Sequence, residues 1–215
     1  MADNIQIMVK PDWVTWDDIK QCLVDAHAVN RAKGINMAHY QWPAEKIKES
    51  LGKSGLVLVA LDGNKLIGTA AIGEEERPFW YVGIKCAYAC FDCVIPECSG
   101  KGIFHKLDKK REELAISRDC KTIVFDTNLD NTKRQSIALK NGYKYVRFFM
   151  ANSRDHYSIV MAKWLNECPF SNQFIKKQFL ISKLLTKLQF KNNGKERGRY
   201  ITKICKKLRN RFLGH

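Results

Sequence analysis

The sequence predicts a mixed α/β domain over about residues 1–168, followed by a basic helical extension, residues 169–215. Two observations predict this division. The strand and helix patterns follow the order β-α-α-β-β-β-α-β-α-β-β, which differs from that of a simple doubly wound sheet. The net charge of +15 is also divided, because the extension holds thirteen Lys or Arg and one Glu and therefore carries +12.

The composition is that of a globular protein. With 215 residues, 45% of them hydrophobic, the chain is long enough for one well-buried domain and an appendage. It has no uninterrupted apolar stretch of about 18 residues, so no membrane span is predicted. Residues 1–4 have neither a basic flank nor an apolar run, so no secretory signal is predicted. We therefore expect a cytoplasmic protein whose eight cysteines are reduced thiols.

Apolar spacing and turn residues place the individual elements. Thr15 and Asp18 form a capping-box pattern at the start of the first helix, Gly34 ends that helix, and Pro43 opens the second. Asp62, Gly63 and Asn64 form a hairpin turn between two strands. The predicted strands are 5–9, 56–61, 66–72, 81–95, 121–127, 143–150 and 157–164. The predicted helices are 15–33, 43–52, 103–118 and 131–141.

Residues 94–107 are typical of a strand that ends, a glycine turn and a helix that begins. Pro96 cannot donate to a sheet ladder, and Gly100 and Gly102 permit unusual backbone dihedrals. The first N–H groups of the following helix have no internal partners, and together with the helix dipole they favour an anion. The turn is therefore predicted to bind a phosphate group.

Three features, in order, resemble the GNAT acyltransferase family. The family's phosphate loop has Gln or Arg, two residues, Gly, one residue, and then Gly or Ala; residues 97–102 keep the glycines and depart at Glu97. Residues 131–143 resemble the family's next helix, with Asn131 followed eleven residues later by Gly142 and an aromatic residue. Residues 157–165 resemble its closing strand. The resemblance extends over roughly residues 3–166.

The resemblance implies a mixed, mostly antiparallel sheet with helices on both faces and one parallel strand pair that splays apart. Acetyl-CoA, the acyl donor, would lie in the gap between the strand that ends at Ile95 and the strand 121–127. Strand backbone and Asn131 would meet the pantetheine arm, the turn's N–H groups would bind the pyrophosphate, and Lys133 or Arg134 would meet a phosphate. The implied donor-binding residues are Cys93, Val94, Cys98, Ser99, Gly100, Lys101, Gly102, Ile103, Asn131, Lys133 and Arg134.

The implied reaction is direct transfer, in which a neutral primary amine attacks the thioester carbonyl through a tetrahedral oxyanion. Backbone donors on the splayed strand would stabilise the oxyanion, a base would take the amine proton, and an acid would protonate the thiolate. The family's frequent acid is a Tyr, and Ala138 stands at that position. Either another group replaces the Tyr, the thiolate leaves unaided, or the chain binds CoA without catalysing.

Three carboxylates are candidates for the catalytic base. Asp92 lies in mid-strand near the expected splay, where burial of a carboxylate costs free energy and therefore suggests a function. Otherwise Asp92 caps a backbone group or faces solvent. Asp126 lies at a strand end, which also suits a turn or a helix N-cap. Glu74 is followed by Glu75 and Glu76 at a position where family bases sometimes sit, although three consecutive acids also suit a solvated loop.

Cys86, Cys90 and Cys93 have the C-x3-C-x2-C spacing of radical-SAM iron–sulfur enzymes. That spacing suits a loop around a cluster, whereas these residues lie in a predicted strand. Strand alternation places Cys86 and Cys90 on one face and Cys93 on the other, and three thiolates on opposite faces cannot share one cluster. We therefore predict buried thiols and no metal.

The extension contains two apolar stripes at helical spacing, with basic residues on the other faces. Their members are Phe170, Phe174, Ile181, Leu184, Leu185 and Leu188, and then Ile201, Ile204, Cys205, Leu208 and Phe212. Three alternatives stay open. The stripes pack on the domain or on a second subunit, they lie on an anionic membrane surface, or they meet nucleic acid. Base stacking is disfavoured, because Tyr200 is the one Trp or Tyr of this segment.

The sequence therefore predicts an N-acetyltransferase that uses acetyl-CoA and an amine acceptor: a small molecule, a sugar or a protein. Residues 39–42 and the hairpin near His156 are expected to shape the acceptor pocket. A second copy of the chain in a homodimer and, through residues 169–215, the inner face of the membrane stay open as partners, and nucleic acid is the least expected partner. The alternative function is a non-catalytic CoA-binding protein whose basic tail contacts a membrane or nucleic acid.

Overall fold

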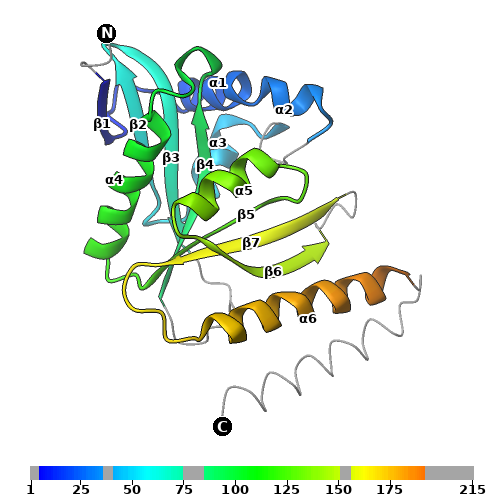
Figure 1. The fold of residues 1–215 in the computed structure, drawn as a ribbon. Coiled ribbons are helices and arrows are strands. Elements are labelled where there is room, and N and C mark those ends of the chain that lie inside the picture. The colour runs from blue at the N-terminus through cyan, green and yellow to red at the C-terminus, as the bar shows by residue number, and fades with distance from the viewer. Residues whose placement is uncertain (1–4, 36–40, 75–84, 151–155, 192–215) are drawn as a thin grey trace.

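Seven strands form one mixed sheet in the order β1-β2-β3-β4-β5-β7-β6 in this computed structural model (Figure 1). The structure describes residues 5–35, 41–74, 85–150 and 156–191. The strands are β1 (Ile5–Val9), β2 (Leu56–Asp62), β3 (Lys65–Glu74), β4 (Cys86–Val94), β5 (Thr122–Asn128), β6 (Lys144–Met150) and β7 (Tyr157–Trp164). The helices are α1 (Trp16–Ala26), α2 (Ala28–Ala32), α3 (Ala44–Glu49), α4 (Ile103–Ser117), α5 (Thr132–Lys140) and α6 (Asn172–Lys191).

The predicted order of strands and helices is confirmed within the described residues, with two differences. β4 begins at Cys86, and residues 81–84 of the predicted longer strand lie outside the described residues. The helix predicted over 15–33 is divided into α1 and α2, because His27 leaves helical geometry with φ −103° and ψ 8°. Burial lowers the pKa of His27, so its ring is neutral at pH 7, and Nε2 donates to the carbonyl oxygen of Asp92 over 3.1 Å.

β4 and β5 are the one parallel pair of the described sheet, and they pair over a short length. The register joins Cys86–Tyr88 to Thr122–Val124. Beyond Tyr88, β4 remains paired with β3, and beyond Val124, β5 remains paired with β7. The two strands therefore separate toward their carboxyl ends. This confirms the predicted mixed α/β fold, with its mostly antiparallel sheet and splayed parallel pair.

A β-bulge interrupts β4 beside the splay. Two residues of β4, Phe91 and Asp92, together oppose one residue of β3, Ala70. Phe91 has a φ of 52°, a left-handed conformation that costs a non-glycine residue about 1–3 kcal/mol. Thr69 Oγ1 donates to the Phe91 carbonyl oxygen over 2.6 Å, so a side chain of β3 holds the bulge in place.

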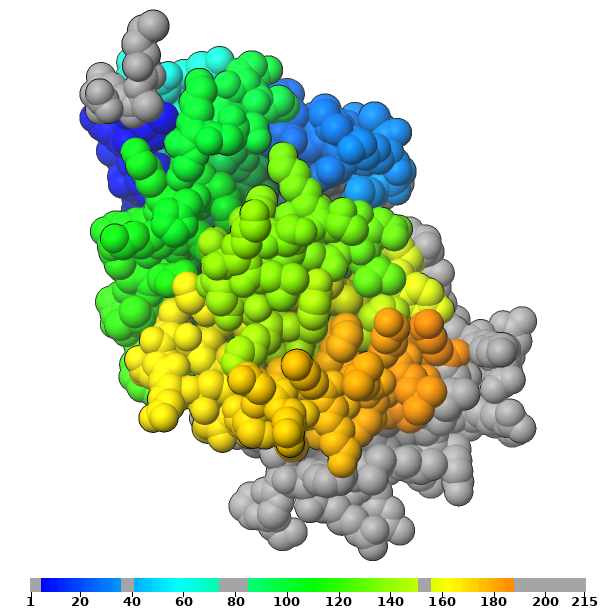
Figure 2. Space-filling model, viewed as in Figure 1, coloured from blue at the N-terminus to red at the C-terminus, as the bar shows by residue number. Residues whose placement is uncertain are grey.

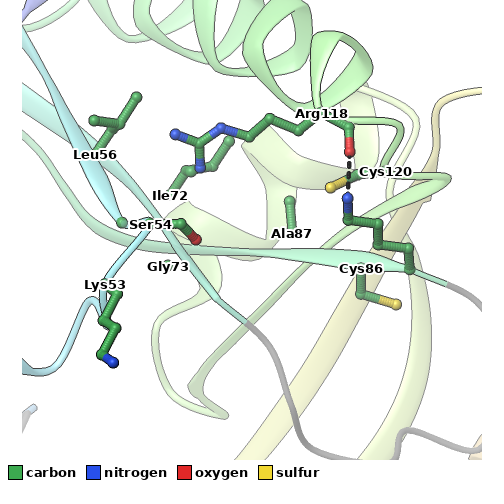
Figure 3. Close-up of a pocket in the computed structure, with 11 residues that line it drawn as sticks. Lys53, Ser54, Leu56, Ile72, Gly73, Cys86, Ala87, Arg118 and Cys120 are labelled. Atoms are coloured by element: carbon green, nitrogen blue, oxygen red, sulfur yellow. Dashed lines mark hydrogen bonds between the residues drawn. The ribbon is translucent and has the colours of Figure 1, made fainter.

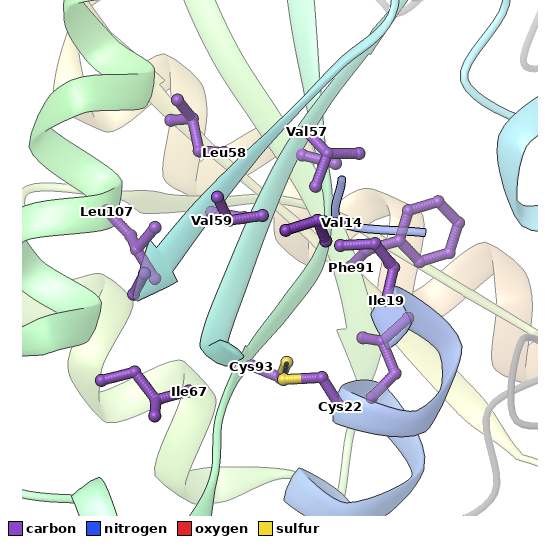
Figure 4. Close-up of a cluster of buried hydrophobic side chains, with 14 of the residues drawn as sticks. Val14, Ile19, Cys22, Val57, Leu58, Val59, Ile67, Phe91, Cys93 and Leu107 are labelled. Carbon is purple, nitrogen blue, oxygen red and sulfur yellow. Dashed lines mark hydrogen bonds between the residues drawn. The ribbon is translucent and has the colours of Figure 1, made fainter. Parts of the chain in front are cut away.

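The bulge corrects the predicted faces of the β4 cysteines. Cys90 pairs with Ala71 and Cys93 with Thr69, and because these partners are two residues apart on β3, both cysteines lie on one face. The prediction that Cys93 points away from Cys90 is therefore wrong, since the extra residue shifts the alternation by one. Cys93 Sγ lies 3.6 Å from Cys22 Sγ of α1 (Figure 4). Within the described part of the chain, no group of three or more His, Cys, Asp or Glu is placed to hold a metal ion.

Helices cover both faces of the sheet. α1 packs against β3 and β4, and α4 packs against β1, β2, β3 and β4. Residues 57–61 of β2 are all buried, which explains why this strand is an uninterrupted apolar run. Figure 4 shows this core, with Leu107 of α4 and Ile19 of α1 on opposite sides of the strands.

Helix α6 lies along β6, the outer strand of the sheet (Figures 1 and 2). Ser182 Oγ accepts the N–H of Phe148 over 2.9 Å, and Thr186 Oγ1 donates to the carbonyl oxygen of Phe148 over 3.2 Å. These bonds satisfy backbone groups that an edge strand otherwise leaves open. The first part of the extension therefore packs on the domain.

The stripe by which α6 packs differs from the predicted one. Ile175 and Ser182 are buried, whereas Leu184, which the apolar spacing places in the stripe, is 59% exposed. The helix contacts an open strand edge, and hydroxyl groups serve that edge better than leucine does. The predicted second stripe, 201–212, lies outside the described residues. None of the helices that the structure describes is long and apolar enough to cross a membrane.

Arg111 ties α4 to the sheet from a fully buried position. Its guanidinium donates to both carboxylate oxygens of Asp92 on β4 and to Asp108 one turn earlier on α4. Asn141 Nδ2, after the end of α5, donates to Asp108 over 3.1 Å. The buried charge is tolerated because it is both paired and hydrogen-bonded.

Replacing Ser182 with Ala is expected to lower the free energy of unfolding by about 1–3 kcal/mol, because the Phe148 N–H would be left buried without an acceptor. Urea denaturation of the two proteins measures this difference. Ser136→Ala on the exposed side of α5 is the matched control and is expected to change the free energy by less than about 0.5 kcal/mol. Equal stability of S182A and wild type would contradict the proposed edge contact.

The pairing of Asp108 predicts a loss of stability in acid. Burial alone would raise the pKa of Asp108, but the Arg111 guanidinium and the Asn141 hydrogen bond outweigh it, and the pKa lies below the ordinary 3.8. The unfolded chain then takes up a proton at higher pH than the folded chain does. The stabilisation is complete above about pH 5 and is lost as the pH falls through the lowered folded pKa.

The measurement compares urea unfolding of wild type and Asp108→Asn between pH 7 and pH 3. The Asn variant cannot titrate at this position, so its stability deficit is expected to shrink as the pH falls. A deficit that stays constant with pH would show that Asp108 contributes no charge-dependent stability.

Candidate functional site

The turn between β4 and α4 has the shape that the sequence predicts. A short 3₁₀ helix, η2 (Pro96–Cys98), follows β4, and Gly100 and Gly102 then adopt φ of 81° and 74°. A Cβ added at either glycine meets no atom within 4 Å, so backbone conformation and not space requires glycine there. Gly102 is the N-cap of α4 and supplies no side-chain cap, so the first-turn N–H groups remain available to an anion.

The predicted turn residues differ in their exposure. Residues 99–102 are exposed, Cys98 is half-buried against the core, and Ile103 is buried beneath the first turn of α4. The exposed segment leaves room for a ligand above the backbone. Its assignment to a pyrophosphate stays a prediction.

The splay turns one backbone edge of β4 toward the gap. The Ile95 N–H donates to the Ile67 carbonyl oxygen on β3 over 2.9 Å. Successive residues of a strand present their N–H and C=O groups to opposite edges, so Val94 presents its backbone toward β5 and Cys93 presents its backbone toward β3. Of the two predicted pantetheine contacts, Val94 therefore has the suitable orientation.

Asn131 is the N-cap of α5. Its Oδ1 accepts the N–H of Arg134 over 3.3 Å, and its Nδ2 donates to Thr127 Oγ1 over 3.3 Å. Both ends of the amide are thus engaged in holding α5 to β5, a role that the prediction of a pantetheine contact did not include. Lys133, the next predicted residue, is exposed.

Arg134 turns inward and crosses the gap from α5 to β4. Its Nη2 donates to Asp92 Oδ2 over 2.6 Å. Its guanidinium carbon lies 4.1 Å from the ring centroid of Phe125 on β5 and 4.8 Å from that of Phe104 on α4. Arg134 of α5 therefore contacts β4, β5 and α4 at the place where the strands separate.

Asp92 is held by two arginines. Oδ1 accepts from Arg111 Nη1, and Oδ2 accepts from Arg111 Nη2 over 3.3 Å and from Arg134 Nη2. Its side chain is 11% exposed and points toward α4. A general base needs an oxygen directed at the proton that it takes. This arrangement gives Asp92 the role of an anchor for two guanidinium groups, so we do not assign it as the base.

Asp126 lies within β5 and not at a turn or helix cap. Its Oδ1 accepts a hydrogen bond from the hydroxyl of Tyr88 on β4, so this contact also spans the splay. Tyr88 is paired opposite Val124, and Asp126 lies two residues further along β5, on the same face. That face of the sheet is the one that α1 covers. Tyr88 and Cys90 lie on the same side of β4 and, because of the bulge, Cys93, which contacts Cys22 of α1, lies on that side too. Asp126 is exposed, and it lies on the opposite face from Asp92.

Glu74 is the last residue of β3, and its backbone pairs with Ala87 at the end of the sheet where β4 and β5 are joined. This places its backbone away from the glycine turn. Glu75, Glu76 and residues 36–40, which include residues 39 and 40 of the predicted acceptor loop, lie outside the described residues. Ala138, at the position of the family's frequent acid, is fully buried in the core.

A pocket of about 690 Å³ lies at the joined end of β4 and β5 (Figure 3). Its basic residues are Lys53, Lys85 and Arg118, and Lys85 Nζ donates to the Arg118 carbonyl oxygen over 2.6 Å. No motif in the sequence signals this pocket, because its lining comes from separate segments of the chain. The sequence also gives no local signal for the contact of Arg111 with Asp92 or of Tyr88 with Asp126, because these partners lie 19 and 38 residues away.

Solved structures of acetyltransferases have the same fold. The ribosomal-protein-S18-alanine N-acetyltransferase from Escherichia coli matches 78% of this chain and 97% of its own, with 13% identity and a TM-score of 0.58. An aminoglycoside 6'-acetyltransferase type Ii matches 76% and 99%, with 22% identity and a TM-score of 0.60. An aminoglycoside 6'-N-acetyltransferase complexed with coenzyme A matches 77% and 99%, with 20% identity and a TM-score of 0.54. At these identities the likeness concerns the fold.

Comparison with curated protein sequences gives no significant match. The sequence profile of the Acetyltransferase (GNAT) family, however, matches residues 16–143, which is more than half of the chain. The matched range contains the parallel strand pair, the glycine turn and the Asn131 helix described above. The chain therefore belongs to the GNAT acetyltransferase family.

Proposed function

We propose that the protein is an N-acetyltransferase that moves an acetyl group from acetyl-CoA to a primary amine by direct attack. The observation that carries the proposal is the splay itself. β4 and β5 separate after Tyr88 and Val124, and the gap opens toward the glycine turn at the start of α4. An anion site and an open strand edge at one gap suit a donor that has a diphosphate and an amide-containing arm.

The donor side of the proposed site uses backbone groups. The first-turn N–H groups of α4 bind the diphosphate, and the backbone of Val94 pairs with the pantetheine amides. The exposed Lys133 adds a positive charge near the start of α5. These contacts leave the thioester beside the bulge at Phe91, and backbone N–H groups on the β5-facing edge of β4 stabilise the oxyanion.

The chemistry takes place on the Asp126 side. The amine lone pair forms a bond to the thioester carbon, the tetrahedral oxyanion collapses, and the C–S bond breaks to release the CoA thiolate. Asp126 takes the amine proton, and the Tyr88 hydroxyl orients its carboxylate. A free thiol has a pKa of about 8.5, so the thiolate leaves near neutral pH without a hydroxyl at the position of Ala138.

One feature favours a second role for the extension, which is contact with an anionic membrane surface. Leu180 and Leu184 are 62% and 59% exposed on α6. Exposed lysines flank them at 176, 177, 183 and 187. Apolar residues flanked by basic ones suit the headgroup region of anionic lipids. The same feature supports the alternative of a CoA-binding protein that acts at a surface, with a location at the inner face of the membrane.

Replacing Asp126 with Asn is expected to lower kcat for acetyl transfer about 10²- to 10⁴-fold, because the amide cannot take the amine proton. Release of CoA thiol is measured with acetyl-CoA and a panel of amino sugars, amino acids, polyamines and peptides with a free N-terminus. The rise in melting temperature caused by CoA is expected to be unchanged in the variant. Asp130→Asn, which removes an exposed carboxylate between β5 and α5, is the matched control and keeps full turnover.

Two results would contradict this assignment in different ways. Full turnover by D126N would remove Asp126 as the base and leave donor binding intact. No stabilisation of the wild-type protein by CoA would remove both the transferase and the CoA-binding alternative.

The membrane proposal predicts that the full chain floats with vesicles that contain phosphatidylserine and does not float with neutral vesicles. Leu180→Glu together with Leu184→Glu is expected to reduce the floated fraction at least severalfold, since charged residues do not enter the headgroup boundary. Leu139→Glu, an exposed leucine on α5, is the control. Equal flotation of the double variant and wild type, or binding to RNA in place of vesicles, would overturn the proposal.

A further inference from the structure

The gap between β4 and β5 is crossed by a buried ion pair. Arg134 reaches from α5 to Asp92 on β4, with its guanidinium between the rings of Phe104 and Phe125. The side chain of Arg134 is 13% exposed, and its Nη1 is buried without a hydrogen-bond partner. The arginine is therefore paired on one side only, although a guanidinium offers five N–H donors.

The contacts of Arg134 join the two sides of the gap, because Asp92 is on β4 and Phe125 is on β5. A donor arm that lies between the separating strands, as in the proposed function, therefore lies next to the Arg134 guanidinium.

We infer that Arg134 is a positioning residue with two partners: Asp92 when the donor is absent, and the diphosphate of acyl-CoA when the donor is bound. This inference rests on the proposed function, because it takes acyl-CoA as the ligand of the gap. It adds that donor binding exchanges one anion for another on the same guanidinium, and that the exchange opens the path for the arm.

The position of Arg134 makes the exchange reachable. Its guanidinium already lies 4.8 Å from the ring of Phe104, the second residue of α4, and thus beside the helix start that offers N–H groups to an anion. Its backbone lies in the first turn of α5, fixed by the Asn131 cap. The planar fork of arginine matches two oxygens of a phosphate as well as it matches those of a carboxylate.

Asp92 is not left unpaired after the exchange. Arg111 keeps two hydrogen bonds to its carboxylate, and Arg111 is itself shared with Asp108. The remaining buried set then has one cation, Arg111, shared by two carboxylates, with Asn141 also donating to Asp108. The departing Arg134 is neutralised by the phosphate. An exchange of this kind avoids the large penalty of an isolated buried charge.

Two probes separate this role from a merely structural one. CoA carries both the diphosphate and the arm, whereas pantetheine carries the arm alone. In Arg134→Gln the gap is open, but the cation for the diphosphate is missing. The variant is expected to bind CoA about tenfold or more weakly than wild type and to bind pantetheine at least threefold more tightly. These opposite shifts are measured by calorimetry for CoA and by competition with CoA for pantetheine.

Three further variants test the same inference. Asp92→Asn releases Arg134 without removing it and is expected to bind both probes at least threefold more tightly. Arg134→Lys keeps the charge and loses the fork, so its CoA affinity is expected to lie between those of wild type and R134Q. Lys140→Gln removes an exposed charge from the other end of α5 and is expected to leave both affinities unchanged. Thermal unfolding confirms that each variant is folded, and R134K replaces R134Q if the latter is not.

Each result of these binding measurements either supports or overturns the exchange. Opposite shifts for the two probes in R134Q support the exchange. Shifts in one direction for both probes, or no shift, overturn it while leaving CoA binding established. Failure of wild type and all variants to bind CoA overturns the proposed function, and the exchange with it.

Discussion

The short pairing of β4 with β5 is the constraint from which the rest of the site follows. β4 stays paired with β3 from Ala87 to Val94 on both sides of the bulge at Phe91 and Asp92, and a bulge of this kind increases the local twist of a strand beside the separation of β4 and β5. A strand edge that loses its neighbour exposes N–H and C=O groups that need partners. The same interruption brings the carboxyl end of β4, the glycine turn and the start of α4 to the mouth of the gap. One break in the sheet therefore places an open strand edge beside a helix start whose N–H groups have no side-chain cap.

The separation also leaves interior space between the strands and helices α4 and α5, which the chain fills with charged residues. Asp92, Asp108, Arg111 and Arg134 form a formally neutral set in which each charge meets an opposite one. Buried ion pairs are often no more stabilising than apolar residues of the same volume. Stability alone therefore does not explain why arginine and aspartate occupy this space. A set in which Arg134 exchanges one anion for another, as inferred above, responds to donor binding, whereas an apolar core does not.

Local signals predicted the strands, the glycine turn and the capped helices, because spacing and turn chemistry act over a few residues. They failed for features that depend on contacts between residues far apart in the sequence. The bulge lies at Phe91, and a phenylalanine gives no sequence signal for a positive φ. The bulge reversed the expected face of Cys93. The side by which α6 packs depends on the open edge of β6, and the sequence of α6 alone contains no signal for that edge. The sequence also gave no signal for the two arginines, 19 and 42 residues away, that hold Asp92.

The two aspartates of the splay show how sheet geometry assigns different roles to one residue type. Both lie on strands that border the gap, but Asp92 faces α4 and the arginines, whereas Asp126 is exposed on the α1 face beside Tyr88. If the donor enters from the α4 side, the acceptor meets the thioester from the other side, where a carboxylate is available. An amine must lose a proton to complete the transfer, while a thiolate is a tolerable leaving group by itself. In the proposed reaction, Asp126 is the ionisable group for the step that requires a base, and Ala138 stands at the step that can proceed without an acid.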